Sequence, residues 1–252
     1  MKLNIYSSRI FLLHLILLGC TAGSQATTLF SKVRGNVVEY QCRLATRVPA
    51  STTFLGLHGA CSLMCQKTED CRFFCTLAST GACALFKAFV AVRWQGHPTS
   101  GTSTTYDACY TSWGDPRDIV KTNSPFTFSS NSLAFPQRYA TDGYACLVPY
   151  SIFATNLETN SYSQIDLEQI SRVQAVIVAT SEITYIKDMD VLLSNTSDFT
   201  LGQKIGRVNG YTPYWSTYTI NTNTSVAGRY ITFYTAQYSI HGYADIQVIP
   251  LL

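Results

Sequence analysis

The chain has 252 residues, of which 46% are hydrophobic and 13% are charged, with a formal net charge of +3. The apolar fraction is sufficient for a hydrophobic core and excludes a wholly disordered chain. Lys and Arg form no basic stripe, so no nucleic-acid partner is expected. The nine cysteines are an odd number, which needs an explanation in a secreted protein.

Residues 1–26 have the features of a secretory signal peptide. A basic start is followed by the apolar run Ile10 to Leu18 and by the small-x-small cleavage pattern Ser24-Gln25-Ala26. An uncleaved membrane anchor and a bacterial lipoprotein signal at Cys20 are the alternatives. Cleavage removes Cys20 and leaves eight cysteines, which predicts a secreted, extracellular protein with up to four disulfides.

Two glycosylation sequons suit this secretory route. They begin at Asn195 and Asn223, and both read Asn-Thr-Ser. Such sequons also arise by chance in a chain rich in Ser and Thr, so they are supporting observations only.

The remaining cysteines are unevenly distributed. Seven of them precede residue 112, and only Cys146 follows it. We therefore expect a small disulfide-rich α+β domain over residues 27–112 and a domain over residues 118–252 that folds mainly by hydrophobic burial. The turn signal at Trp113 to Pro116 predicts a linker over residues 113–117.

One helix and three strands are expected in the first domain. The helix is predicted over residues 57–66, where Cys61 and Cys65 lie one turn apart on the same face. The strands are predicted over residues 72–74, 82–86 and 88–92. The cysteine spacings contain none of the close pairs that zinc ribbons use, so disulfides are expected rather than zinc.

Three short motifs of this domain resemble the PAN/apple module over roughly residues 38–112. They are Cys61-Ser-Leu-Met-Cys65, Cys71-Arg-Phe-Phe74 and Cys83-Ala-Leu-Phe86. The resemblance implies a non-enzymatic module that binds proteins or glycans. It also implies the disulfides Cys42–Cys109, Cys61–Cys83 and Cys65–Cys71.

That pairing leaves Cys75 and Cys146 without partners. They can bridge the two domains, form an intermolecular bond or remain free thiols. The Cys75–Cys146 bridge is our preferred prediction, in a monomer, and a disulfide-linked dimer is the second choice.

The second domain is predicted to be all-β. Turn residues separate short strands at fairly regular spacing, and no long helical period interrupts them, which is typical of a sandwich or barrel. The predicted strands cover residues 163–167, 173–180, 190–193, 204–208, 217–220, 229–235 and 245–249. The whole chain is therefore expected to be mainly β.

Five segments in this order resemble the discoidin-like, galactose-binding-like domains of coagulation factors, and especially their fucolectin branch. The segments are Tyr139 to Gly143, Tyr162 to Leu167, Ile170 to Val178, Gly228 to Phe233 and Ala244 to Val248. The resemblance covers roughly residues 118–252 and implies an antiparallel β-sandwich of the jelly-roll type.

In the fucolectin branch, one His and two Arg residues on adjacent loops hold fucose. The matching positions here fall near Ala154, Ala179 and Tyr185, so this triad is not present. Sugar binding by another set of loop residues stays open, because aromatic faces stack on sugar rings and polar side chains supply hydrogen bonds. The candidates are Tyr150, Asn156, Glu158, Tyr185 and Lys187. The alternative is that these are ordinary polar loop residues.

The same resemblance implies a structural calcium ion. Asp142 and Asp245 match the acidic positions that hold it, although Asp142 can equally cap its own turn. Other discoidin-like domains bind membranes through apolar loops, and Leu147 to Tyr150 lie in the corresponding loop. Burial of that loop beneath a disulfide of Cys146 is the preferred interpretation.

The sequence as a whole predicts a secreted, non-enzymatic, lectin-like protein that recognises glycans or extracellular glycoproteins, in innate recognition or cell-surface adhesion. No nucleophile elbow, metalloprotease motif or phosphate loop accompanies His58, His97 and His241. A glycosidase with two distant carboxylates stays open, because such pairs leave no spacing signal. The alternatives are protein–protein adhesion through the PAN-like domain and phospholipid binding.

Overall fold

The structure is a computed structural model, and it describes most of the chain after residue 28. The described residues are 29–34, 37, 42–52, 56–96, 106–132, 135–146, 152–181, 183–212, 214, 216–222 and 226–251. The predicted signal peptide, the sugar-binding candidate Tyr150 and the sequon residue Asn223 lie outside them. Antiparallel strands predominate in the described part, which confirms the mainly β prediction. No helix in that part is long and apolar enough to cross a membrane.

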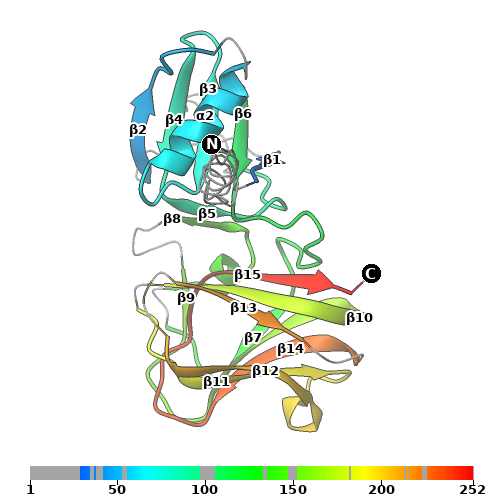
Figure 1. Ribbon diagram of the computed structural model, residues 1–252. Helices are drawn as coiled ribbons and strands as arrows, with labels where there is room; N and C mark the ends of the chain where they lie inside the picture. Colours follow the sequence, from blue (N-terminus) through cyan, green and yellow to red (C-terminus); the bar gives the residue numbers. More distant parts are fainter. Residues whose placement is uncertain are drawn as a thin grey trace, which may run out of the picture.

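The N-terminal unit is a five-stranded antiparallel sheet with one helix packed against it (Figure 1). The strands run in the order β1-β6-β3-β4-β2. Their bounds are Ser31–Val33 (β1), Arg43–Arg47 (β2), Phe73–Leu77 (β3), Ala82–Phe86 (β4) and Ala108–Thr111 (β6). The central strands β3 and β4 are buried almost throughout, so they form the core of this unit.

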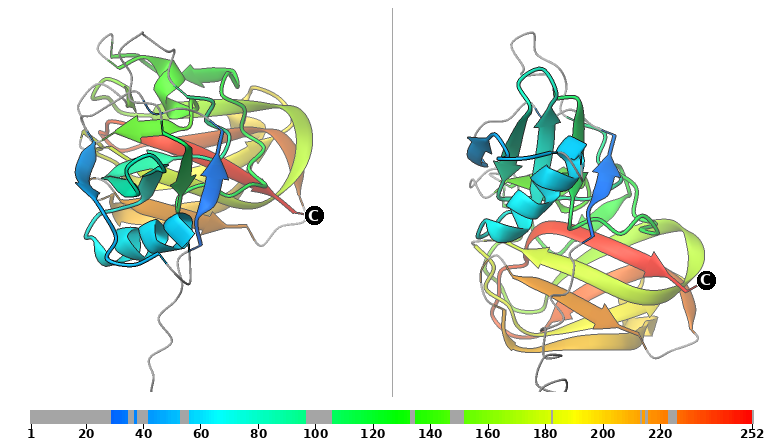
Figure 2. Two further views of the ribbon diagram at one scale, coloured as in Figure 1. Left: turned by 90° about the horizontal axis from the view of Figure 1, so that it is seen from above. Right: turned by 45° about the horizontal axis from the view of Figure 1, so that its top comes forward.

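Helix α2 (Gly56–Lys67) lies across one face of this sheet, as Figure 2 shows. It is one residue longer at each end than predicted. Cys61 and Cys65 lie on its buried face and pack with Phe74 and Leu85 of the sheet. The helix is therefore held by apolar burial as well as by disulfides.

Two of the four predicted disulfides are present, and the other two cysteine pairs are exchanged. Cys61–Cys83 and Cys65–Cys71 join α2 to β4 and to the start of β3, as the resemblance implied. The predicted Cys42–Cys109 and Cys75–Cys146 pairs are wrong. The structure instead contains Cys42–Cys146 and Cys75–Cys109.

Strand register explains the exchange. Cys75 on β3 is directly opposite Cys109 on β6, with 4.0 Å between their Cα atoms, so these two cysteines form a cross-strand bridge. The carbonyl of Cys42 accepts a hydrogen bond from the backbone of Lys87, just before β5 (Ala88–Val90), which places Cys42 near Cys146. A bridge between the two halves of the chain therefore exists, but Cys42 supplies it.

Each of the eight cysteines that follow Cys20 is paired within the chain. None of these eight remains for an intermolecular bond, so the alternative of a disulfide-linked dimer is wrong.

The C-terminal unit is an antiparallel β-sandwich. Its strands hydrogen-bond in the order β12-β11-β14-β10-β15-β9, and β7 and β13 also pair with β10. The bounds are Phe126–Phe128 (β7), Phe153–Ala154 (β9), Ser161–Thr180 (β10), Lys187–Ser194 (β11), Gln203–Tyr211 (β12), Thr217–Asn221 (β13), Ala227–Thr235 (β14) and Gly242–Pro250 (β15). Two short 3-10 helices, Gln137–Ala140 (η1) and Phe199–Leu201 (η2), lie in the connections. This arrangement agrees with the predicted sandwich.

Strand β10 belongs to both layers of the sandwich. Its first half pairs with β7 and β14, and its second half pairs with β13 and β15. The sequence predicted two strands separated by a turn, but an irregularity between Asp166 and Ser171 replaces that turn. Glu168 adopts a φ of 60° there, so the strand bends without ending.

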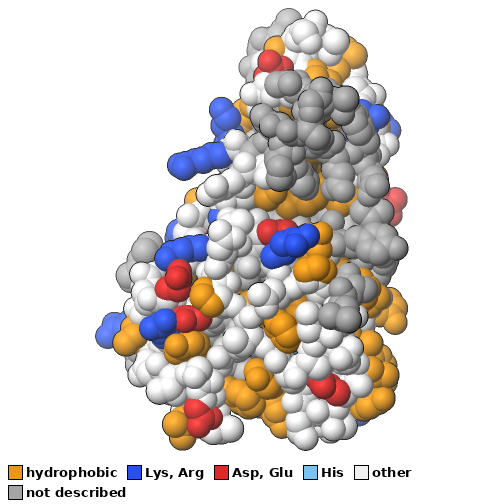
Figure 3. Space-filling view, turned by 180° about the vertical axis from the view of Figure 1, so that it is seen from behind, with side chains coloured by type: hydrophobic (Ala, Val, Ile, Leu, Met, Phe, Trp, Pro, Cys, Tyr) orange, Lys and Arg blue, Asp and Glu red, His pale blue; other side chains and the backbone are white. Residues whose placement is uncertain are grey.

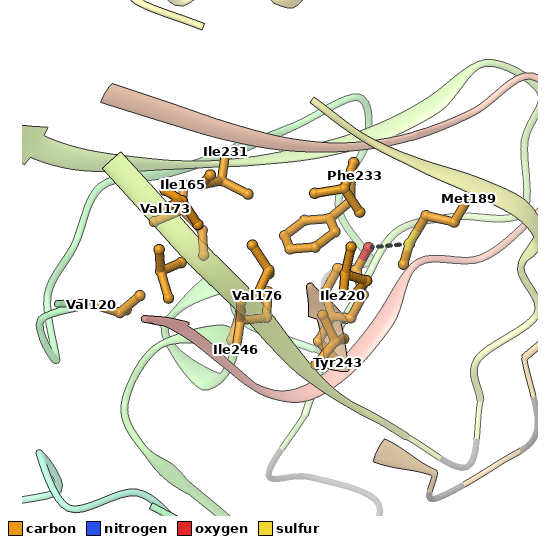
Figure 4. Packing of buried hydrophobic residues seen from close by; sticks show 14 of the residues in the cluster. Val120, Ile165, Val173, Val176, Met189, Ile220, Ile231, Phe233, Tyr243 and Ile246 are labelled. Carbon is orange, nitrogen blue, oxygen red and sulfur yellow. Dashed lines mark hydrogen bonds between the residues drawn. The ribbon is translucent and has the colours of Figure 1, made fainter. Parts of the chain in front are cut away.

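Apolar side chains from the two layers fill the space between them (Figure 4). Ile165, Ile231 and Phe233 come from β10 and β14, whereas Val176 and Ile246 come from the second half of β10 and from β15. All five are fully buried. Interdigitated side chains of this kind hold the layers of a sandwich together.

The two units meet at a junction built from distant parts of the sequence. Strand β5 of the N-terminal half pairs with β8 (Tyr144–Cys146) of the C-terminal half, and these strands lie between the two units in Figure 1. Beside them, Phe89 contacts the Trp113 ring edge-on and packs with Ala179 and Ala244 of the sandwich. The predicted linker around Trp113 is thus part of this packed junction.

We expect peptide mapping of the unreduced protein by mass spectrometry to recover Cys42–Cys146 and Cys75–Cys109 as linked pairs. Replacement of both Cys42 and Cys146 by serine should lower the free energy of unfolding by about 2–5 kcal/mol, because a long loop is no longer closed in the unfolded chain. Denaturant unfolding measures this loss. Recovery of a peptide that links Cys42 to Cys109 would contradict the assigned register.

Candidate functional site

The segment from Tyr238 to His241 connects the predicted sugar-binding residues. Glu158 forms two backbone hydrogen bonds with Ser239, and Tyr185 forms two with Ile240. In an extended chain, the backbone N–H and C=O groups of successive residues point in opposite directions. The segments that contain Glu158 and Tyr185 therefore lie on opposite sides of the Tyr238–His241 segment. Paired residues share a face and successive residues do not. The side chains of Glu158 and Tyr185 are therefore expected on different faces.

On one face, Tyr185, Lys187 and Tyr211 form a group that we call the tyrosine cluster. The ring centroids of Tyr185 and Tyr211 are 5.5 Å apart, and Nζ of Lys187 lies 5.5 Å from the Tyr211 centroid. The cluster arises because Lys187 on β11 is opposite Tyr211 on β12, where the two strands reach the edge of the sandwich. Sequence reasoning identified Tyr185 and Lys187 but missed Tyr211.

The tyrosine cluster is open to solvent. Tyr185 is 42% exposed and Tyr211 is 58% exposed, and Tyr214, on the connection that follows β12, is 62% exposed. A hydrogen bond with Tyr211 raises the pKa of Tyr185 above its ordinary value, whereas the charge of Lys187 lowers it. The cluster therefore presents two partly exposed aromatic rings, two phenolic hydroxyl groups and one ammonium group on a single surface.

Glu158 has a different environment. Its carboxylate accepts hydrogen bonds from the hydroxyl groups of Ser129 and Ser130, and the Ser130 hydroxyl also accepts one from the backbone of Asn156. These bonds tie the connection after β9 to the connection after β7. The structure thus separates the predicted residues into the tyrosine cluster and a glutamate–serine network that orders a loop.

A buried polar network lies beneath the Tyr238–His241 segment. Nδ1 of His241 is 2.9 Å from the hydroxyl of Tyr243 and 3.2 Å from that of Ser163, and all three side chains are buried. Nε2 of His241 and Oγ of Ser239 have no hydrogen-bond partner in the described part of the structure. Burial lowers the pKa of His241 to about 3, so this imidazole is neutral at physiological pH. Sequence reasoning assigned no role to His241.

The predicted calcium ligands Asp142 and Asp245 lie near Arg93, away from the tyrosine cluster. The guanidinium of Arg93, which is 9% exposed, forms ion pairs with Asp245, at 0% side-chain exposure, and with Asp118, at 3%. Nε of Arg93 also donates to the carbonyl of Thr141 at 3.1 Å, and Nη2 donates to the carbonyl of Ile246 at 3.0 Å. We refer to Arg93, Asp118, Asp142 and Asp245 as the arginine cluster.

Three other carboxylate oxygens of the arginine cluster also accept hydrogen bonds. Oδ2 of Asp245 accepts a hydrogen bond from the Trp113 indole at 2.9 Å. Oδ1 of Asp118 accepts from two backbone amides, and Oδ1 of Asp142 accepts from the amide of Tyr144. Calcium needs six to eight oxygen ligands, whereas the oxygens here are directed at N–H donors. Calcium therefore does not fit between Asp142 and Asp245.

Burial is the largest influence on the pKa values of the three aspartates in this cluster. It raises the pKa of Asp142 to about 8 and that of Asp118 to about 6, and Arg93 acts in the opposite direction on both. Burial also raises the pKa of Asp245, against the effects of Arg93 and the Trp113 hydrogen bond. Burial lowers the pKa of Arg93, but Asp245, Asp118 and Asp142 together raise it above its ordinary value, so the guanidinium stays charged. Among the described residues, no group of three or more His, Cys, Asp or Glu side chains is placed to hold a metal ion.

Two further predictions concern the surface of the sandwich. Asn195 is exposed in the bend that follows β11, so it is accessible to glycosylation, which stays a prediction. The apolar loop Leu147 to Tyr150 lies outside the described residues. On the face seen in Figure 3, the coloured Lys and Arg side chains are interspersed with Asp and Glu.

Solved structures similar to this chain include carbohydrate-binding modules and lectins. A fucose binding module from Streptococcus pneumoniae, SpX-3, is 16% identical, with a TM-score of 0.43 over 54% of this chain and 98% of that chain. The lectin domain of lectinolysin, complexed with Lewis B antigen, is 18% identical, with a TM-score of 0.45 over 55% of this chain and 99% of that chain. A fucolectin from serum of the striped bass Morone saxatilis is 14% identical, with a TM-score of 0.48 over 63% of this chain and 64% of that chain. No family model and no curated protein matches the sequence.

The buried His241 should make the fold sensitive to acid. Its pKa is about 3 in the folded protein and near 6.5 when unfolded, so the unfolded state binds the proton first as the pH falls. The stability associated with neutral His241 is complete above pH 6.5 and is lost as the pH falls from there to about 3, by up to about 1.4 kcal/mol per pH unit.

Denaturant unfolding of the wild type and of His241→Gln at several pH values measures this effect. The variant should show a shallower loss of stability than the wild type within that window. Replacement of the exposed His58 by Gln is the matched control for loss of a histidine side chain. Equal slopes in the wild type and His241→Gln would contradict the assignment.

Proposed function

We propose that this protein is a secreted, non-enzymatic carbohydrate-binding protein whose binding site is the tyrosine cluster. The observation that carries the proposal is the solvent-exposed pair of Tyr185 and Tyr211 beside Lys187. Tyrosines usually bury part of their rings, whereas Tyr185 and Tyr211 are 42% and 58% exposed.

The chemistry of the cluster matches a sugar ring. A pyranose has apolar C–H faces that stack on aromatic rings, and its edge carries hydroxyl groups that both donate and accept hydrogen bonds. Tyr185 and Tyr211 supply the rings and two hydroxyl groups, and Lys187 supplies three N–H donors. The cluster therefore offers both kinds of contact within one surface.

The scaffold holds this surface in place. The backbone of Tyr185 is bonded to Ile240, and the carbonyl of Lys187 accepts a hydrogen bond from the hydroxyl of Thr235 on β14. Side chains fixed before the ligand arrives lose less conformational entropy when they bind it. Loops and strand ends on a rigid sandwich are common positions for binding residues.

Secretion is supported by the cysteines. The four intrachain disulfides are typical of proteins that fold in an oxidising compartment. The predicted signal peptide at residues 1–26 agrees with this compartment, which is where glycans of cell surfaces are encountered.

A glycan array probed with the full mature chain, with and without calcium, tests the function. We expect binding to a subset of glycans, and a blank array under both conditions would contradict the proposal. Tyr211→Ala and Tyr185→Ala should each raise the dissociation constant for a bound glycan by about tenfold or more, because each removes a stacking surface.

Tyr230→Ala is the matched control. Tyr230 also has a cation near its ring, with the guanidinium carbon of Arg229 5.2 Å from the centroid. It pairs with Ser194 at the far end of β11 from Lys187, so glycan affinity should not change. Equal losses in Tyr211→Ala and Tyr230→Ala, measured by isothermal titration calorimetry, would remove the tyrosine cluster as the site.

A further inference from the structure

The arginine cluster joins the two units through charge. Asp118, Asp142 and Asp245 all belong to the C-terminal half, whereas Arg93 follows β5 in the N-terminal half, 152 residues from Asp245. Burial of a charged carboxylate lowers the stability of a fold unless the carboxylate is paired or hydrogen-bonded. The acidic groups of the sandwich are therefore stabilised by a cation from another part of the chain.

We propose that Arg93 is the resident cation of this acidic cluster: its guanidinium takes the place of a bound calcium ion, so the sandwich folds without calcium.

The surrounding backbone leaves room for this side chain. Gly143 has a φ of +82°, and a Cβ atom there would lie 3.3 Å from Cγ of Arg93 and 3.4 Å from Cβ of Trp94. A Cβ atom at Gly114 would lie 2.4 Å from the backbone nitrogen of Val92. Gly143 of the C-terminal half and Gly114 of the predicted linker therefore accommodate the segment that carries Arg93.

The donors of Arg93 match the acceptors around it. A guanidinium has five N–H donors in a planar fork, and here they reach two carboxylates and the carbonyls of Thr141 and Ile246. Carboxylates and backbone carbonyls are the ligands that calcium also uses. The guanidinium takes these oxygens as hydrogen-bond acceptors, and its positive charge repels a second cation.

Replacement of Arg93 by alanine in the full chain tests this directly. The variant keeps all three aspartates and the two carbonyls but frees the space of the guanidinium. In EDTA its melting temperature should fall by about 10 °C, because a buried ion pair loses one partner. Millimolar calcium should then restore part of this loss, and terbium, used as a calcium probe, should luminesce on excitation of Trp113, whose indole contacts Asp245.

The wild type should show neither response, with equal melting temperatures in EDTA and calcium. Arg93→Lys, which retains a cation, should remain insensitive to calcium, and Arg93→Ala combined with Asp245→Asn should lose the response that Arg93→Ala gains. A calcium-dependent rise in the wild-type melting temperature would overturn the proposal, and so would an Arg93→Ala variant that calcium does not stabilise. If Arg93→Ala folds only when calcium is present, that requirement itself supports the proposal. None of these measurements depends on glycan binding, so they are independent of the proposed function.

Discussion

One buried guanidinium joins the two halves of this protein. Arg93 donates hydrogen bonds to Asp118, Asp245 and two carbonyls, and little of its side chain reaches solvent. Loss of one partner of such a buried pair typically costs about 3–5 kcal/mol, because the remaining charge is left uncompensated. The pairing of β5 with β8, the Cys42–Cys146 disulfide and the contact of Phe89 with Trp113 all lie at the same junction. Together these contacts make the two units one packed body.

The junction and the tyrosine cluster differ in how many of their polar groups are already bonded within the protein. Asp245 on β15 is occupied with Arg93, whereas Tyr185 pairs with Ile240, in the connection that precedes β15. At the junction, both carboxylate oxygens of Asp118 and of Asp245 accept hydrogen bonds or form ion pairs. The tyrosine cluster leaves two aromatic rings and a cation exposed. These exposed groups are the basis of the proposed binding site, because function depends on the groups at a site and not on the fold alone.

The sequence predicted the positions of helices and strands better than it predicted which strands and cysteines pair with one another. Alternating and β-branched runs located most strands, and the spacing of Cys61 and Cys65 located helix α2, because these signals are local. The bend near Glu168 was interpreted as a turn, because local residues do not show that the two halves of β10 are continuous. The pairing of Cys75 with Cys109 depends on strand register. No sequence pattern near Arg93 indicates its contact with Asp245, because the two residues are 152 positions apart. Tyr211 was missed because its place beside Lys187 depends on the pairing of β12 with β11.

The guanidinium of Arg93 both fixes the junction and takes the place of a metal ion in the sandwich. A crystal structure of the full mature chain grown in millimolar calcium shows which cation lies between the aspartates. We expect continuous density for the Arg93 guanidinium between Asp118 and Asp245, with no ion between them. Density for a calcium ion bound to Asp142 and Asp245, with Arg93 displaced toward solvent, would contradict it.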